Sequence, residues 1–261
     1  MQLIPAIYLE PDDQIGPEHI DAVRRVVSNA GLALLRKTGR VVSVGAPIVR
    51  RGPALPPIPM NTSYGTSGTP EAADLFRTVA AEFPEADEHV VLCFVAGVAG
   101  DSAGLGASRA GYLQDNTGGL GLLGWGNMDA ALETDDRDPM WRLSYCAMVV
   151  RALHEIGHVM GLPHPPGDSA ALSQNTETVM GYNPGAFAFG RSDWGPVNPM
   201  LFAPHELAVV ERHPLLRDAP EEWRPAGGMV GLYGSDLGPV ISGRWPAPRA
   251  LVLGMMVEEY S

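Results

Sequence analysis

The sequence is short of positive charge and has no long apolar run. Its 261 residues include 18 Lys and Arg against 30 Asp and Glu, a net charge of −12 with a pI near 4.9. That balance argues against nucleic acid or an anionic membrane as the main partner, because both attract basic surfaces. No apolar run approaches the roughly 20 residues that a transmembrane helix needs. We therefore expect neither a nucleic-acid partner nor a membrane partner.

A secretion signal is also missing, and cysteine is scarce. Residues 1–10 lack the basic start and the long apolar stretch of a signal peptide, which predicts a cytoplasmic protein. A secreted mature form is the alternative. Cys93 and Cys146 both lie among apolar residues. Two buried thiols are expected and one disulfide is the alternative, and neither decides the compartment. The sequence does not indicate an oligomeric state.

The 45% of hydrophobic residues can form a sizeable core, as one large domain or two lobes. The expected fold class is α/β (α+β). Proline at the first helical position and acidic first turns indicate helix starts, and glycine or proline indicates helix ends. A loop rich in proline, glycine and serine at 50–69 is long for a compact domain and is expected to be functional or mobile. Expected strands are 3–9, 41–49 and 89–95, and expected helices are 17–38 and 70–83.

The chemistry of the chain is concentrated in one motif, H-E-x-x-H-x-x-G-x-x-H. His154 and His158 are four residues apart, so on a helix both imidazoles face the same way and can bind one ion. Gly161 suits the left-handed residue that ends many helices, and a chain that turns back there brings His164 to the same ion. Three nitrogens plus a water are the usual ligands of a catalytic zinc. Glu155, at the edge of that face, can take a proton from the water.

The alternative is a chance H-E-x-x-H on an amphipathic helix with core histidines. A bare H-E-x-x-H arises by chance in unrelated proteins, but a glycine and a third histidine at fixed offsets make coincidence far rarer. The helix itself is well marked, because Asp138 suits the N-cap and Pro139 the first helical position. The sequence therefore predicts a Zn²⁺ site on a helix that begins at Pro139.

This extended motif resembles that of the metzincin metallopeptidases, in which a methionine turn follows the third histidine. Met180, in Thr178-Val-Met-Gly-Tyr182, lies sixteen residues after His164 and matches the methionine of that turn. The resemblance implies that Met180 forms an apolar floor beneath the zinc; an ordinary core methionine is the alternative. It also implies that Tyr182 approaches the metal and hydrogen-bonds the developing oxyanion, unless it only packs in the pocket wall.

The same resemblance implies the architecture. An upper lobe at 1–164 would hold a twisted mixed sheet, long helices and the zinc helix, and an irregular lower lobe at 165–261 would hold the methionine turn and a C-terminal helix at 203–212. The zinc would lie in a cleft between the lobes of one catalytic domain. An antiparallel edge strand at 120–125 would pair with an extended substrate; a glycine-rich surface loop is the alternative. His205 and Glu206 are expected at an exposed helix start, and short strands within 227–261.

These features predict a zinc-dependent endopeptidase. Glu155 would take a proton from a zinc-activated water and pass it to the leaving amine, so peptide or protein chains are the expected substrate. A zinc amide hydrolase with a small or specialised biosynthetic substrate is the alternative, favoured by the missing signal peptide and by the lack of a recognisable pro-segment. A non-enzymatic zinc module is a third hypothesis, disfavoured because a structural site would not need Glu155.

Overall fold

A five-stranded mixed sheet forms the centre of the computed structural model, with strands in the order β3-β1-β4-β6-β5. The structure describes residues 1–55, 70–95, 104–107, 118–124, 132, 139–165, 178–181 and 202–218. Neighbouring strands run parallel except for β5, which is antiparallel to β6. The expected α/β class is confirmed. The strands are β1 (Leu3–Leu9), β3 (Ile48–Arg51), β4 (Val90–Val95), β5 (Gly104–Ala107) and β6 (Gly119–Gly124).

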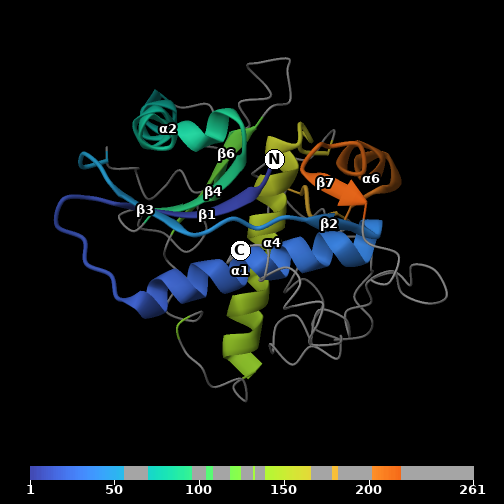
Figure 1. The fold of residues 1–261 in the computed structure, drawn as a ribbon, viewed down its shortest axis with the longest axis horizontal. Coiled ribbons are helices and arrows are strands. Elements are labelled where there is room, and N and C mark those ends of the chain that lie inside the picture. Colours follow the sequence, from blue (N-terminus) through green and yellow to red (C-terminus); the bar gives the residue numbers. More distant parts are fainter. Residues whose placement is uncertain are drawn as a thin grey trace.

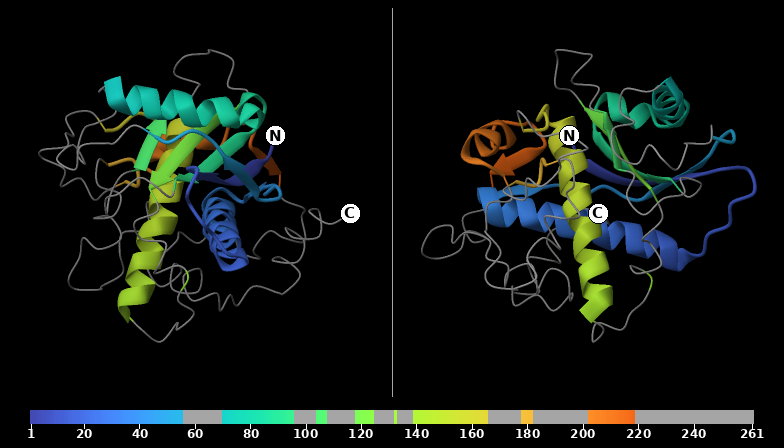
Figure 2. Two further views of the ribbon diagram at one scale, coloured as in Figure 1. Left: turned by 90° about the vertical axis from the view of Figure 1, so that its left-hand side faces the viewer. Right: turned by 180° about the vertical axis from the view of Figure 1, so that it is seen from behind.

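Both faces of the two central strands are buried, as their continuous apolar sequences predict. Every residue of β1 and of β4 is buried. Alternate side chains face opposite ways, so Leu3 and Ile7 join one core cluster while Ile4, Ala6 and Tyr8 join another. Helix α2 covers one face of the sheet, and α1 and α4 lie on the other (Figure 2). The sheet is thus the middle layer of three.

Both early helices lie where the sequence predicts them. Helix α1 (Pro17–Thr38) begins at a proline and ends at Gly39, whose φ of 67° is left-handed and whose N–H donates to the carbonyl of Leu35 at 2.7 Å. Helix α2 (Pro70–Glu82) is followed by a short 3₁₀ turn, η3 (Pro84–Asp87). Glycine and proline therefore set the ends of these helices, as expected from their backbone restrictions.

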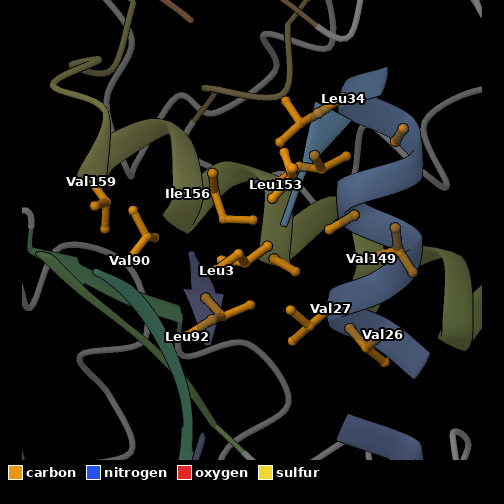
Figure 3. Close-up of a cluster of buried hydrophobic side chains, with 14 of the residues drawn as sticks. Leu3, Val26, Val27, Leu34, Val90, Leu92, Val149, Leu153, Ile156 and Val159 are labelled. Carbon is orange, nitrogen blue, oxygen red and sulfur yellow. The ribbon is translucent and has the colours of Figure 1, made fainter. Parts of the chain in front are cut away.

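Helix α4 (Pro139–Val159) is the long helix that carries the histidine motif, and it begins at the predicted proline. It crosses α1 on one face of the sheet (Figure 1). Their shared core includes Val27 of α1, Leu153 and Ile156 of α4, and Leu3 and Leu92 of the sheet (Figure 3). This packing fixes the last turns of α4 against the strands.

The prediction of one strand at 41–49 is wrong. The structure has two short strands there, β2 (Arg40–Val42) and β3, in different sheets. β2 pairs antiparallel with β7 (Leu216–Asp218), whereas β3 pairs with β1. The chain changes partner straight after β2, because Val44 already forms a parallel bridge with Leu3 of β1. A single regular strand at 41–49 is therefore not formed, since its two ends pair in different sheets.

The prediction of an antiparallel edge strand at 120–125 is also wrong. β6 lies inside the sheet, parallel to β4, and β5 takes the antiparallel position beside it. The alternative of a surface loop is wrong too, because β6 is largely buried. A Cβ on Gly119 would lie 2.6 Å from the Val159 side chain, and one on Gly121 would lie 3.0 Å from Cβ of Glu155. The small residues of β6 therefore make room for α4.

The chain after the histidine motif packs against the first half. Helix α6 (Pro204–Val210), predicted at 203–212, contributes Val210 to the cluster that contains Leu34 and Val42, and β7 completes the two-stranded sheet with β2. The division into lobes at 164 and 165 stays a prediction. Most of the loop at 50–69, the side chain of Cys146 and the strands expected within 227–261 lie outside the described residues. Among the helices that the structure describes, none is long and apolar enough to cross a membrane.

Phe94 tests how much the central strand contributes to stability. Its side chain is fully buried in the cluster shared by the sheet, α1 and α4. Phe94→Ala should lower the free energy of unfolding by about 3–5 kcal/mol, because it removes buried apolar area and leaves a cavity. Urea unfolding measures this. Val209→Ala is the control, since Val209 is 41% exposed, and a surface change of this kind should alter stability by no more than about 0.5 kcal/mol. Equal effects of the two substitutions would contradict the packing described here.

Candidate metal centre

The chain reverses immediately after α4, as the motif predicts. Gly161 has a φ of 89°, a left-handed value that glycine adopts without a Cβ clash. The N–H of Leu162 donates to the carbonyl of Gly157 at 2.9 Å, and the N–H of Gly161 donates to that of His158 at 2.9 Å. These two bonds form a Schellman motif, which satisfies carbonyls left open at the helix end. The turn sends the following residues back toward α4.

This reversal brings three histidines together. His154 and His158 come from the last turns of α4, and His164 comes from the returning segment. One nitrogen of each imidazole lies within 4.8 Å of the other two. No other group of three or more histidine, cysteine, aspartate or glutamate residues with this proximity occurs in the described part of the chain. These three residues are therefore the candidate ligands of a metal ion.

A backbone carbonyl holds the Nδ1 atom of every candidate ligand. His154 Nδ1 lies 2.7 Å from the Val179 oxygen, and His164 Nδ1 lies 3.1 Å from the Met180 oxygen. His158 Nδ1 lies 2.8 Å from the oxygen of Leu162, within the turn itself. Carbonyl oxygens only accept, so each Nδ1 carries the proton and each Nε2 is the unprotonated nitrogen of its ring. Such outer contacts typically fix the tautomer and orientation of metal-binding histidines.

The three nitrogens fit a metal ion. Nε2 of His154 and Nε2 of His158 lie 2.9 Å apart. With both protons on Nδ1, two lone pairs face each other with no proton between them, and a cation is the natural partner for such a pair. Tetrahedral ligands at roughly 2.0–2.1 Å from zinc lie about 3.3 Å from one another, so a small separation of the rings would accommodate that ion.

Burial keeps two of these imidazoles neutral, as metal ligation requires. Burial lowers the pKa of His154 well below its usual value, and the nearby His158 and His164 lower it further, against the opposing bond to the Val179 carbonyl. Burial and then the charge of His164 lower the pKa of His158 to about 4, with the bond to Leu162 opposing them. Both rings therefore keep free lone pairs at neutral pH.

Glu155 directly follows His154 on α4 and has an unpaired carboxylate oxygen. The residue is 2% exposed, and its Oε2 atom has no hydrogen-bond partner among the described residues. Burial raises the pKa of this carboxyl well above its usual value, and a divalent cation held nearby would oppose that rise. A buried carboxylate oxygen without a partner is costly for stability alone. Its place directly after His154 suits a group that exchanges a proton with a ligand.

Met180 lies against α4 at a glycine that the sequence reasoning did not single out. Met180 is fully buried, and a Cβ on Gly157 would lie only 2.3 Å from its sulfur. Gly157 separates Ile156 from His158, so the methionine contacts the helix between the two histidine ligands. Glycine inside a helix is unfavourable by its own propensity. Its presence at 157 was therefore the sign in the sequence that another residue packs closely against the helix there. Tyr182 lies outside the described residues.

The start of α6 holds a second group that sequence reasoning missed. His205 is exposed, as expected, but the prediction of an exposed Glu206 is wrong, because this residue is only 2% exposed. Its carboxylate accepts hydrogen bonds from the Thr178 hydroxyl and from the N–H of Ala203. The second bond is the local capping interaction of a helix start. The first joins residues 28 positions apart, which no local pattern indicates.

Comparisons with known proteins find structural likeness but no family. No family model matches the chain, and no curated protein matches it. Among solved structures, the chain is similar to an archaemetzincin from Methanopyrus kandleri, with 17% sequence identity and a TM-score of 0.42. The match covers 81% of this chain and 94% of the other. A likeness this distant does not assign the chain to a family or to a function.

Gly157 tests the contact between the helix and the methionine. Alanine usually stabilises a helix interior by about 1 kcal/mol relative to glycine. Gly157→Ala should instead lower the free energy of unfolding by about 1–3 kcal/mol, because its methyl group overlaps the Met180 sulfur. Urea unfolding of the single variants and of the double variant with Met180→Ala measures the coupling. A stabilised Gly157→Ala protein would show that the methionine is not packed there.

Proposed function

We propose that this chain is a zinc-dependent hydrolase of the metallopeptidase type that cleaves peptide bonds. One observation carries the proposal. Three imidazoles converge with their Nδ1 atoms held by backbone carbonyls, and Glu155, whose buried Oε2 atom has no hydrogen-bond partner among the described residues, follows His154 on the same helix. A metal site with an adjacent proton acceptor is the arrangement that hydrolysis of an unreactive amide requires.

His154, His158 and His164 would hold the ion. Zn²⁺ bound there would supply Lewis acidity, which makes water a better nucleophile near neutral pH and polarises a carbonyl oxygen. The carbonyls of Val179, Leu162 and Met180 keep the three rings in the tautomer that ligation needs. Because these contacts exist within the protein itself, little reorganisation is needed when the ion binds.

Glu155 would move the proton. Its carboxylate would accept a proton from the attacking water and release it to the leaving amine, so the same group serves as base and then as acid. Burial favours the protonated form between these two events. Glu155 is positioned by the packing of α4 on β6, where Gly121 leaves room for its Cβ.

Two features argue for catalysis over a purely structural ion. Structural zinc sites usually have four protein ligands, whereas the described residues bring three together. A structural site also has no use for a buried carboxylate oxygen that lacks a hydrogen-bond partner among the described residues. Peptide substrates remain the proposal because amide hydrolysis is the chemistry that this combination serves in zinc hydrolases.

Two substitutions separate metal binding from proton transfer. Glu155→Gln should keep one zinc per chain and lower kcat by about 10²–10⁴, because it removes the proton carrier and leaves the ligands. His164→Ala should greatly weaken zinc binding. Zinc content by mass spectrometry and cleavage of a proteome-derived peptide library, with and without a chelator, measure both effects.

Glu88→Gln is the matched control, since Glu88 is exposed and lies far from α4 in sequence. It should leave both zinc content and rate unchanged. Full metal occupancy in His164→Ala would refute the ligand assignment. A Glu155→Gln enzyme within a few-fold of wild type would mean that another group carries the proton. Zinc binding without cleavage of any library peptide would favour a small amide as the substrate.

The Tyr182 hydroxyl is proposed to stabilise the oxyanion that develops on the substrate carbonyl. The proposal rests on the resemblance of the Met180 segment to the methionine turn, two residues before this tyrosine. A phenol is neutral at pH 7 and donates one hydrogen bond. Tyr182→Phe should lower kcat by about 10-fold or more while zinc content stays the same, as steady-state kinetics and metal analysis would show. An unchanged kcat would reduce Tyr182 to a residue of the pocket wall.

A further inference from the structure

We propose that Glu206 is a positioning residue of the metal centre, which acts through Thr178 on two of the three histidine ligands. This inference rests on the proposed function only in taking the three histidines as the metal site. Glu206 belongs to the first turn of α6 and has no contact with the imidazoles in the hydrogen bonds described above. Its effect would reach them through the segment at 178–181.

A directional series of buried hydrogen bonds links Met180, Thr178 and Glu206. The N–H of Met180 donates to the Thr178 hydroxyl at 3.2 Å, and that hydroxyl donates to the Glu206 carboxylate. The N–H of Ala203 donates to the same carboxylate oxygen at 2.7 Å. Thr178 is 4% exposed and Glu206 is 2% exposed. A hydroxyl has one proton to give, so the carboxylate fixes which way the Thr178 hydroxyl points.

These hydrogen bonds hold the short segment 178–181, whose geometry places the acceptors of two histidines. Residues 178–181 form a turn in which the N–H of Gly181 donates to the carbonyl of Thr178 at 3.2 Å. The carbonyls of Val179 and Met180 then face His154 and His164. Both residues are fully buried. A shift of this short turn would therefore move the acceptors of two ligands at once.

The third ligand provides an internal reference. His158 Nδ1 bonds the carbonyl of Leu162, which lies in the turn after α4 and is held by the N–H bond from Leu162 to Gly157. Neither bond involves Thr178 or Glu206. Loss of the Glu206 contact should thus disturb His154 and His164 directly and His158 less, through its neighbours alone. A general loss of stability would not discriminate between the rings in this way.

Threonine variants test the link. Thr178→Val keeps the shape and removes the hydroxyl, and it should weaken zinc binding by about 10- to 100-fold, the usual cost of losing an outer contact of a metal site. Thr178→Ser restores the hydroxyl and should bind zinc within a few-fold of wild type. Glu206→Gln should fall between them, because a neutral acceptor makes a weaker bond than a carboxylate. Competition with a chromophoric chelator measures the zinc affinities.

A second readout needs no metal and no activity. In the apo protein, long-range ¹H–¹⁵N spectra report the Nδ1–H form of each ring. Thr178→Val should shift the Nδ1–H signals of His154 and His164 more than that of His158, whose Nδ1 bonds the Leu162 carbonyl. Leu75→Ala is the control for general destabilisation, because Leu75 is buried in the cluster on the opposite face of the sheet. It should alter stability without altering zinc affinity or the three rings.

The outcomes separate this inference from the proposed function. Wild-type zinc affinity in both Thr178→Val and Glu206→Gln, with unchanged signals from His154 and His164, would overturn the positioning role. Loss of affinity in Leu75→Ala equal to that in Thr178→Val would also overturn it. Absence of hydrolysis would refute the proposed function alone, because affinity and ring spectra do not depend on turnover. If Thr178→Val does not fold, the zinc affinity of Glu206→Gln is compared with that of Thr178→Ser. Equal affinities would overturn the positioning role, and a lower affinity of Glu206→Gln would support it.

Discussion

A helix that continued straight past His158 would carry its next residues away from the first two imidazoles. The third candidate ligand is available only because the chain reverses at Gly161, whose φ of 89° suits glycine. The same turn presents the Leu162 carbonyl to His158. The reversal at Gly161 therefore has two effects. It brings His164 toward the other two imidazoles, and it holds the ring of His158 through the Leu162 carbonyl.

Close packing around α4 places this turn. Gly119 and Gly121 of β6 let the helix approach the sheet, and Gly157 lets Met180 approach the helix from another segment. A methyl group at any of these positions would meet a neighbouring atom at 3.0 Å or less. Glycine is unfavourable in both strands and helices by its own propensity. Its presence here reflects tertiary contact, and it fixes the distance between the candidate ligands and the sheet.

The centre combines groups that are costly to bury without a partner. The Nε2 atoms of His154 and His158 lie 2.9 Å apart, and the Oε2 atom of Glu155, the residue after His154, is unpaired among the described residues. In an interior of low polarity each of these arrangements opposes folding. A cation would relieve both, since it attracts the lone pairs and favours the ionised carboxylate. The electrostatic cost in the protein and the affinity for an ion are therefore two aspects of one arrangement.

The sequence by itself determined the helix and the turn around His154, Glu155, His158 and His164, because these features depend on spacing and backbone preference within one short segment. It did not reveal that β6 lies inside the sheet, nor that Glu206 is buried. Strand order and burial are set by which distant segments pack together, and residue patterns record only which faces are apolar. The carbonyls that hold His154 and His164 also come from a separate segment, 178–181. Only the tertiary structure brings them to the rings, because every residue has a carbonyl and its sequence carries no sign of which one will be used.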